Sequence, residues 1–232
     1  MALFQSQVLT QASGSVGGMT YSRNRGGMYI RARTVPTNPN TTFQQTVRAI
    51  LADLTNKWQN TLTTAQRAAW NVYASEVTMF NRLGQEITLS GQQHYVRSNA
   101  PRGLDAANLP RVDDAPTTFN LGDFTPVSIT AAEPTTGSIA FTEADDWVDE
   151  DDGGLLVFCS RPINAGVSFF RGPYRFAANV AGDSGVPPTT PAGITWPFTL
   201  TAGQGAAARV IVTRADGRLS ATQFLGPIVV SV

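Results

Sequence analysis

The sequence predicts an α+β fold in which an extended N-terminal arm with a β-hairpin precedes a small helical domain and a C-terminal β-sandwich. Three observations support this prediction: an arginine-rich, glycine-rich stretch near the start, apolar residues at helical spacing after it, and alternating apolar and polar residues in the second half. We therefore divide the chain into an arm at 1–40, a helical domain at 41–112, a linker at 113–123 and a sandwich domain at 124–232.

The arm is defined by the stretch GSVGGMTYSRNRGGMYIRARTVPTNPNT, which begins at Gly14. Glycine pairs permit the positive φ angles of tight turns, so we predict a strand at Met19–Arg23, a turn at Asn24–Gly27 and a strand at Met28–Thr34. A two-stranded ribbon with so few large apolar side chains cannot offset its own ordering entropy. We therefore interpret the arm as a docking element that another surface completes.

Two helices are predicted directly after the arm. Apolar residues at three- and four-residue steps indicate an amphipathic helix over 42–60, which Asn40 or Thr41 can cap. Thr63, followed three residues later by Gln66, forms a capping-box pattern, and the helical period then continues to about Phe80. The short link between the helices favours an antiparallel pair.

A third helix is predicted after a short extended segment at 86–89. Ser90 and Gln93 repeat the capping-box pattern, so the helix begins near Gly91. It continues through Asn99, and Pro101 ends or kinks it. The proline- and aspartate-rich sequence that follows has no periodicity, which is typical of a linker.

The second half of the chain is predicted to form seven short strands. Glycine and proline punctuate them, and Asp216-Gly217 is a strong hairpin signal. About seven strands in a domain of this size are typical of an immunoglobulin-like or fibronectin type III-like sandwich, here without a cysteine pair. The predicted strands are Thr125–Ala131, Gly137–Glu143, Gly154–Arg161, Tyr174–Val180, Thr195–Thr201, Ala207–Arg214 and Leu219–Val230.

The residue content argues against common catalytic and metal chemistry. His94 is the single histidine and Cys159 the single cysteine, which excludes an internal disulfide and zinc sites built on several cysteines. Both residues stand in ordinary structural contexts. We therefore expect no enzyme activity, no catalytic residue and no cofactor. An enzyme that degrades cell walls is the least favoured hypothesis, because the chain offers few acid-base groups.

A strip of seven carboxylates spans residues 143–152. Oxygen-rich loops can bind calcium, but the EF-hand pattern is not matched here. Like charges at this density more often form a solvated loop or complement a basic surface. We favour that reading over a calcium site and predict no metal ligand. Ser184, in a GDSG sequence, is assigned to a loop because the rest of a protease pattern is missing.

Charge is distributed unevenly along the chain. The formal net charge is zero, yet residues 1–112 carry +7 and residues 113–232 carry −7. Such asymmetry suggests different partners for the two halves, or copies that pack head to tail.

The arginines of the arm allow three interpretations: nucleic-acid binding, docking on protein by addition of a strand, or a solvated hairpin. Docking on protein is favoured, and nucleic acid is disfavoured as the partner because the chain is neutral and poor in lysine. The predicted partner-binding residues are Tyr21, Arg23, Arg25, Tyr29, Arg31 and Arg33.

Membrane insertion and secretion are not expected. The sequence has no run of about 18 apolar residues, which a membrane span requires. Its start has no basic region followed by an apolar run of useful length, so it does not read as a secretory signal. We expect synthesis and use in a cytoplasm.

The order of segments resembles a group of uncharacterised bacteriophage and prophage structural proteins. TYSRNRGGMYIRAR, TNPNT, QQTVRAILADLTNKW, LTTAQRAAWNVYA and LSGQQHYVRSN carry the resemblance, which covers residues 13–115 and extends further only by architecture. It implies a virion component anchored to the capsid, neck or tail, assembled in the host cytoplasm with other virion proteins and further copies of itself. The alternative is a receptor- or glycan-binding module, in which Trp147 and Trp196 would supply aromatic platforms.

Overall fold

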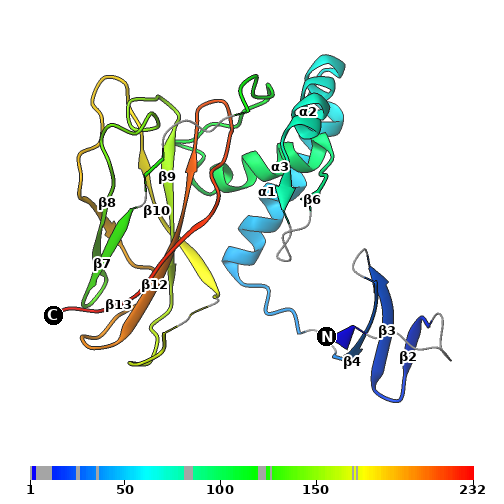
Figure 1. The fold of residues 1–232 in the computed structure, drawn as a ribbon, viewed down its shortest axis with the longest axis horizontal. Helices are drawn as coiled ribbons and strands as arrows, with labels where there is room; N and C mark the ends of the chain where they lie inside the picture. The colour runs from blue at the N-terminus through cyan, green and yellow to red at the C-terminus, as the bar shows by residue number, and fades with distance from the viewer. Residues whose placement is uncertain are drawn as a thin grey trace. The chain divides into compact units, whose positions relative to one another are not determined.

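The computed structural model describes residues 2–3, 12–24, 27–34, 37–80, 86–119, 124–125, 127–168, 170 and 172–232. It divides the chain into two compact units, Met1–Thr41 and Thr42–Val232. The fold is mixed α+β, with three α-helices and several antiparallel sheets in the described residues (Figure 1), which confirms the predicted class. The finer division of the second unit into a helical domain, a linker and a sandwich domain stays a prediction.

The first unit forms a four-stranded antiparallel sheet in the order β1-β4-β3-β2. The predicted hairpin is present as β3, Met19–Asn24, and β4, Gly27–Ala32, with Asn24 paired to Gly27. Two further strands, β1 at Ala2–Leu3 and β2 at Gly14–Val16, extend the hairpin on either side. The residues at the tip of the hairpin, 25 and 26, lie outside the described residues.

The second unit begins with two helices joined by a short link. Helix α1 spans Thr42–Asn60, as the apolar periodicity predicted. Helix α2 spans Thr64–Glu76, and its predicted capping box is confirmed because Thr63 Oγ1 accepts from the Gln66 amide while Gln66 Oε1 accepts from the Thr63 amide. The predicted continuation of α2 to Phe80 is wrong. Val77 is already extended, and β5, Met79–Phe80, pairs instead with β6, Glu86–Ile87.

Helix α3 spans Gly91–Arg102 and carries the second predicted capping box, between Ser90 and Gln93. Pro101 does not end the helix, because the helix continues one residue further before a 3-10 turn, η1, at Gly103–Asp105. Gly91 allows α3 to lie against α2, since an added Cβ would meet the Asn71 amide nitrogen at 2.7 Å. The helices are therefore closely packed at this point.

The remaining residues form two antiparallel sheets. One has the order β11-β8-β7 and the other the order β10-β9-β12-β13. A parallel bridge between Ala132 and Ser231 connects the end of β7 to the residues after β13. The strands are β7 Ser128–Ala132, β8 Thr136–Ala140, β9 Gly154–Ser160, β10 Tyr174–Ala181, β11 Ala192–Thr195, β12 Gly205–Thr213 and β13 Gln223–Val229.

Two of the predicted strands are displaced along the chain. The strand expected at Thr195–Thr201 lies at Ala192–Thr195, because Pro197 has no N–H to donate and the chain leaves the sheet after Trp196. The final strand begins at Gln223 rather than Leu219. The hairpin signal at Asp216-Gly217 marks a real turn, in which Gly217 has a φ of 89° and donates its N–H to the Arg214 carbonyl.

Three apolar clusters stabilise the second unit. The largest lies between the two sheets and includes Trp147, Trp196, Cys159 and Leu155. A second joins the three helices around Trp70 and Tyr95, whose ring centroids lie 5.6 Å apart. The third lies on the other face of β9, where Leu156 and Phe158 pack against Leu109. Strand β9 is consequently buried on both faces.

Candidate partner-binding sites

The sheet of the first unit has two chemically different faces. Residues paired across antiparallel strands share a face, so Tyr21 lies with Ile30, and Met19 lies with Val16. The opposite face carries Thr20 and Arg31, and here the Ser15 and Thr20 hydroxyls are 2.8 Å apart. One face is thus mainly apolar, and the other is mainly polar.

The apolar face is only partly covered by the described residues of this unit. Of the residues of Met1–Thr41 whose burial is described, none is buried; Met19 is 50% exposed and Val16 is 74% exposed. Tyr21, Met28 and Ile30 are half-buried. A sheet that buries so little apolar surface gains little of the free energy that folding requires, so its surface is suited to a contact with another molecule.

The sequence-predicted site residues divide between these faces. Tyr21 and Arg23 are two residues apart on β3, so both lie on the apolar face. Tyr29 and Arg31 are likewise two residues apart on β4, and both lie on the opposite face. Arg23, Arg31 and Arg33 are exposed. Arg25 lies outside the described residues. The predicted set therefore does not form a single surface, and the role of its members in partner binding stays a prediction.

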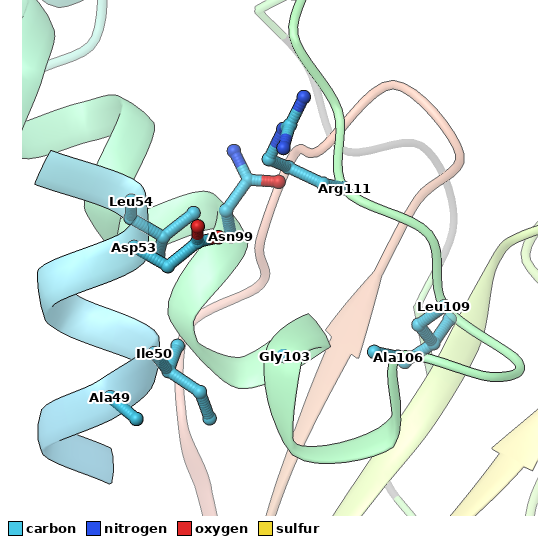
Figure 2. Close-up of a pocket in the computed structure, with 9 residues that line it drawn as sticks. All are labelled: Ala49, Ile50, Asp53, Leu54, Asn99, Gly103, Ala106, Leu109 and Arg111. Atoms are coloured by element: carbon cyan, nitrogen blue, oxygen red, sulfur yellow. The ribbon is translucent and has the colours of Figure 1, made fainter. Parts of the chain in front are cut away.

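A pocket of about 330 Å³ lies between α1, α3 and the segment after η1 (Figure 2). Its floor is apolar, and the Asp53 carboxylate and the Arg111 guanidinium lie among the residues that line it. Gly103 is needed in this wall, because an added Cβ would meet Cγ2 of Ile50 at 2.9 Å. The lining residues include no nucleophile beside a general base, so the pocket offers shape and charge rather than chemistry. Its residues are Ala49, Ile50, Asp53, Leu54, Asn99, Gly103, Ala106, Leu109 and Arg111.

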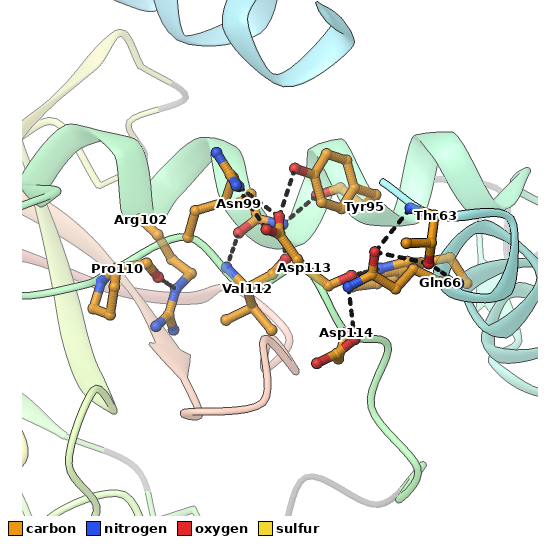
Figure 3. A network of polar contacts seen from close by, with 11 residues as sticks. Thr63, Gln66, Tyr95, Asn99, Arg102, Pro110, Val112, Asp113 and Asp114 are labelled. Carbon is orange, nitrogen blue, oxygen red and sulfur yellow. Dashed lines mark hydrogen bonds and ion pairs between the residues drawn. The ribbon is translucent and has the colours of Figure 1, made fainter. Parts of the chain in front are cut away.

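The polar edge of this pocket is held by a network that reaches the start of the predicted linker (Figure 3). The Asn99 side chain binds both backbone groups of Val112, donating to its carbonyl at 2.9 Å and accepting from its amide at 2.7 Å. Arg111 forms a two-bond ion pair with Asp113, at 2.5 and 2.6 Å. The Arg111 guanidinium holds the pKa of the Asp113 carboxyl below its ordinary value.

Aromatic and amide groups extend the same network. The Tyr95 hydroxyl donates to Asp113 Oδ1 at 3.3 Å, and burial is the main cause of the raised pKa of Tyr95. The Trp70 indole N–H donates to the Asp113 carbonyl at 2.9 Å, and Gln66 Nε2 donates to Asp114 at 2.9 Å. Residues 113 and 114 are therefore fixed to the helices by side chains of α2 and α3.

Arg102 is a fully buried charge that sequence reasoning did not identify. Its guanidinium donates to the Thr213 hydroxyl at 3.0 Å and to the carbonyls of Pro110, Arg214 and Asp152 at 2.7 to 3.1 Å. Burial lowers the pKa of Arg102. A buried guanidinium that binds four acceptors from three segments of the chain has a structural function. No local sequence pattern could have revealed acceptors this distant in the chain.

Most of the acidic strip is engaged in contacts within the protein. Asp145 is buried and accepts from the Thr125 amide at 3.1 Å, and Asp151 accepts from the Ser184 amide at 2.8 Å. Arg214 pairs with Asp146 at 3.1 Å and also with Glu150. The strip is thus an ordered loop. Within the described residues, no three His, Cys, Asp or Glu side chains lie close enough together to hold a metal ion.

The single histidine and the single cysteine both lie in packed surroundings. His94 is fully buried and its ring meets that of Tyr73 edge to face, with centroids 5.4 Å apart. Burial, and secondarily Arg97, lowers the pKa of His94. Cys159 is buried in the sandwich core, where burial raises its pKa to about 12. Each group is therefore kept in its neutral form at neutral pH.

Trp147 and Trp196 do not form aromatic platforms. Both are buried between the two sheets, with exposed fractions of 0% and 1%. The expectation that these two residues stack on sugars is wrong, because a ring enclosed by core side chains cannot contact a ligand. The two tryptophans are instead large core residues that fill the space between the sheets.

Among the described residues, no helix has the length and apolar character that crossing a bilayer demands. No protein-family model, no curated protein and no solved structure matches the chain.

Proposed function

We propose that this chain is a structural protein of a bacteriophage virion, anchored to the capsid, neck or tail through its arm and helical region. One observation carries the proposal. The arm folds as a four-stranded sheet in which no residue of described burial is buried, and the described residues of its own unit leave its apolar face partly exposed. A sheet of this kind gains its missing apolar contacts in an assembly, where neighbouring proteins supply them. The segment order at residues 13–115 is a second source of support.

We further propose that the sandwich is of the fibronectin type III-like class. The support is the strand order, three strands as β11-β8-β7 and four as β10-β9-β12-β13, with the first two strands and the fifth in the smaller sheet. The buried tryptophans between the sheets are compatible with this class of sandwich. In the proposed function this domain faces outward from the virion or contacts a neighbour.

The proposed role is not catalytic. The histidine and the cysteine, which are the usual groups for proton transfer and nucleophilic attack near neutral pH, are both buried and neutral. The receptor-binding alternative loses its specific support, since Trp147 and Trp196 are core residues. We therefore retain the structural role alone.

Limited proteolysis with trypsin tests the proposal. The isolated protein and the protein in assembled particles are digested in parallel, and the fragments are identified by mass. In the free protein we expect cleavage at Arg23, Arg31 and Arg33, which are exposed, while residues beyond Thr42 survive. In particles the same sites become protected. Equal protection of the arm in the free protein would show that it needs no partner, and the docking role would be abandoned.

A matched pair of variants tests the contribution of charge. The triple variant Arg23→Gln, Arg31→Gln, Arg33→Gln removes three exposed charges from the arm, and its control, Arg161→Gln with Arg175→Gln, removes exposed charges from the sandwich. We expect the first variant to be lost from purified particles and the control to be retained. Normal incorporation of the triple variant would argue that these arginines do not anchor the protein.

A further inference from the structure

An apolar groove of about 270 Å³ lies on the outer face of the larger sheet, where α1 and α3 pass over it. Its sides come from the first half of α1 and from the end of α3, and its base comes from three strands of the sheet. The groove is lined on the helix side by residues that include Phe43, Val47 and Leu51 of α1. On the sheet side its lining includes Phe158, Tyr174 and Arg209.

The helix that borders the groove is poorly covered. In the 19 residues of α1 the buried residue is Leu54, although apolar side chains recur along the whole helix. Phe43 and Leu51, which line the groove, are each 40% exposed. Large side chains that remain this exposed around a concave surface are typical of a binding site.

Arg209 gives the groove its chemical character. Its guanidinium carbon lies 4.6 Å from the centre of the Phe158 ring and 5.6 Å from that of Tyr174. Its Nε is buried, and no acceptor in the described part of the chain bonds to it. No Asp or Glu is among the groove-lining residues, so Arg209 is the one charged group there within the described chain.

These features call for one kind of occupant. A buried donor on a cation without an acceptor is energetically costly, and a carboxylate is the acceptor that best matches a guanidinium. The stacking on two rings holds the guanidinium in place, which lowers the ordering cost of binding. The apolar walls in turn favour a side chain without charge next to that carboxylate.

We propose that this groove binds an acidic, apolar peptide segment of a partner protein, whose carboxylate pairs with Arg209 while a neighbouring apolar side chain fills the space beside Phe43 and Leu51. The groove is lined by residues of the second unit and by none of the arm, so its test is distinct from the test of arm anchoring. Loss of arm anchoring would leave groove binding unchanged, and loss of groove binding would leave arm protection in particles unchanged.

Nuclear magnetic resonance titration of the ¹⁵N-labelled full chain tests the proposal. The probe is the blocked tetrapeptide acetyl-Leu-Asp-Leu-Leu-amide, and the matched probe has Asn in place of Asp. We expect saturable shifts at residues that line the groove, and an affinity for the Asp peptide about tenfold higher than for the Asn peptide. Added salt should weaken the binding of the Asp peptide more than that of the Asn peptide, because salt screens the ion pair between Arg209 and the Asp carboxylate.

Two variants distinguish a loss of the Arg209 charge from a general change of the fold. Arg209→Met keeps an apolar stem against the rings, and we expect it to bind both peptides with the affinity that the native chain has for the Asn peptide. The control is Arg175→Met, on β10 of the same sheet, where the Arg175 guanidinium carbon lies 4.8 Å from the centre of the Phe198 ring, outside the groove. This control should keep the preference for the Asp peptide.

A second pair tests the apolar wall without touching Arg209. Leu51→Ser should lower the affinity for both peptides by about tenfold. Val72→Ser, at an exposed position on α2, should leave both affinities unchanged. The proposal is overturned by any of three results. These are no saturable binding of the Asp peptide, equal affinity for the two peptides in the native chain, or equal effects of the groove variants and their controls.

Discussion

The Arg102 guanidinium donates a hydrogen bond of 3.0 Å to the Thr213 hydroxyl, and both residues are fully buried. One belongs to the last turn of α3 and the other to the end of β12, so the bond joins the helices to the sandwich. The same guanidinium also donates to the Arg214 carbonyl, next to Thr213, and to carbonyls of two further segments, those of Pro110 and Asp152. This contact ties together parts of the chain that have different local periodicities.

Removal of the Arg102 guanidinium should strongly destabilise the second unit. In Arg102→Met the acceptors around it lose a charged donor and remain buried, so we expect the free energy of unfolding to fall by about 3 kcal/mol. Urea unfolding followed by tryptophan fluorescence measures the change. The control Arg161→Met, at an exposed position, should change stability little. A cost below about 1 kcal/mol would contradict the assigned role of Arg102, since that is the range of exposed pairs.

His94 should make stability depend on pH in one direction. Burial lowers the pKa of His94 in the folded protein, whereas in the unfolded chain this pKa is near the ordinary value of 6.5. Below pH 6.5 the unfolded chain therefore binds the proton more readily than the folded protein does. Stability is therefore complete above pH 6.5 and falls as the pH drops toward the folded pKa, by at most about 1.4 kcal/mol for each pH unit. The charged and titratable groups that act on the ring are Arg97 on α3 and Tyr73 on α2.

Urea unfolding at pH 7.5, 6.5 and 5.5 tests this expectation. His94 is the single histidine of the chain, so His94→Leu should remove most of the slope between these values. An unchanged slope in that variant would assign the pH dependence to carboxylates instead.

Two glycines of the smaller sheet should respond oppositely to a methyl group. An added Cβ at Gly137 would meet the Trp196 indole and lie 2.6 Å from the Thr130 carbonyl, whereas at Gly193 it meets nothing within 4 Å. We expect Gly137→Ala to cost about 2–3 kcal/mol through overpacking, and Gly193→Ala to be neutral or slightly stabilising. Thermal unfolding monitored by circular dichroism compares the two. Similar melting temperatures would show that the tryptophan can move aside.

The capping boxes should each contribute measurably to the helical region. Thr63→Ala and Ser90→Ala remove the side-chain oxygens that accept from the amides of Gln66 and Gln93, at 3.2 and 3.3 Å. We expect each substitution to lower stability by about 1 kcal/mol. Thr61→Ala, at a neighbouring exposed position, serves as the control. If the caps and the control had equal effects in urea unfolding, the hydroxyls would not act as caps.

The sequence predicted those elements whose signals are local. Thr63 with Gln66, and Ser90 with Gln93, marked the starts of α2 and α3 because a cap involves residues only three positions apart. Helix α1 followed from its apolar spacing. The end of α2 was missed because Met79 and Phe80 pair with β6, and a pairing partner is not visible in the helix's own sequence.

Contacts between distant segments could not be predicted in the same way. The alternative glycan-binding hypothesis used Trp147 and Trp196 as aromatic platforms, yet both fill the space between two sheets whose register the sequence does not determine. Arg102 looked like an ordinary basic residue near a helix end, and its acceptors lie up to 112 positions away. The division of Arg23 and Arg31 between the two faces of the arm sheet required the register of its strands, which the sequence does not determine.

The anchoring of residues 109–114 has a consequence for how this protein can be cut and recombined. Leu109 packs against side chains of β9, and the Val112 carbonyl accepts a hydrogen bond from the Asn99 side chain. The Asp113 carbonyl accepts a hydrogen bond from the indole N–H of Trp70. A chain ended between the helices and the sandwich would leave these buried groups without partners. The sandwich therefore cannot be exchanged between related proteins by a crossover at this point, and viable exchange requires residues 42–232 to be inherited together.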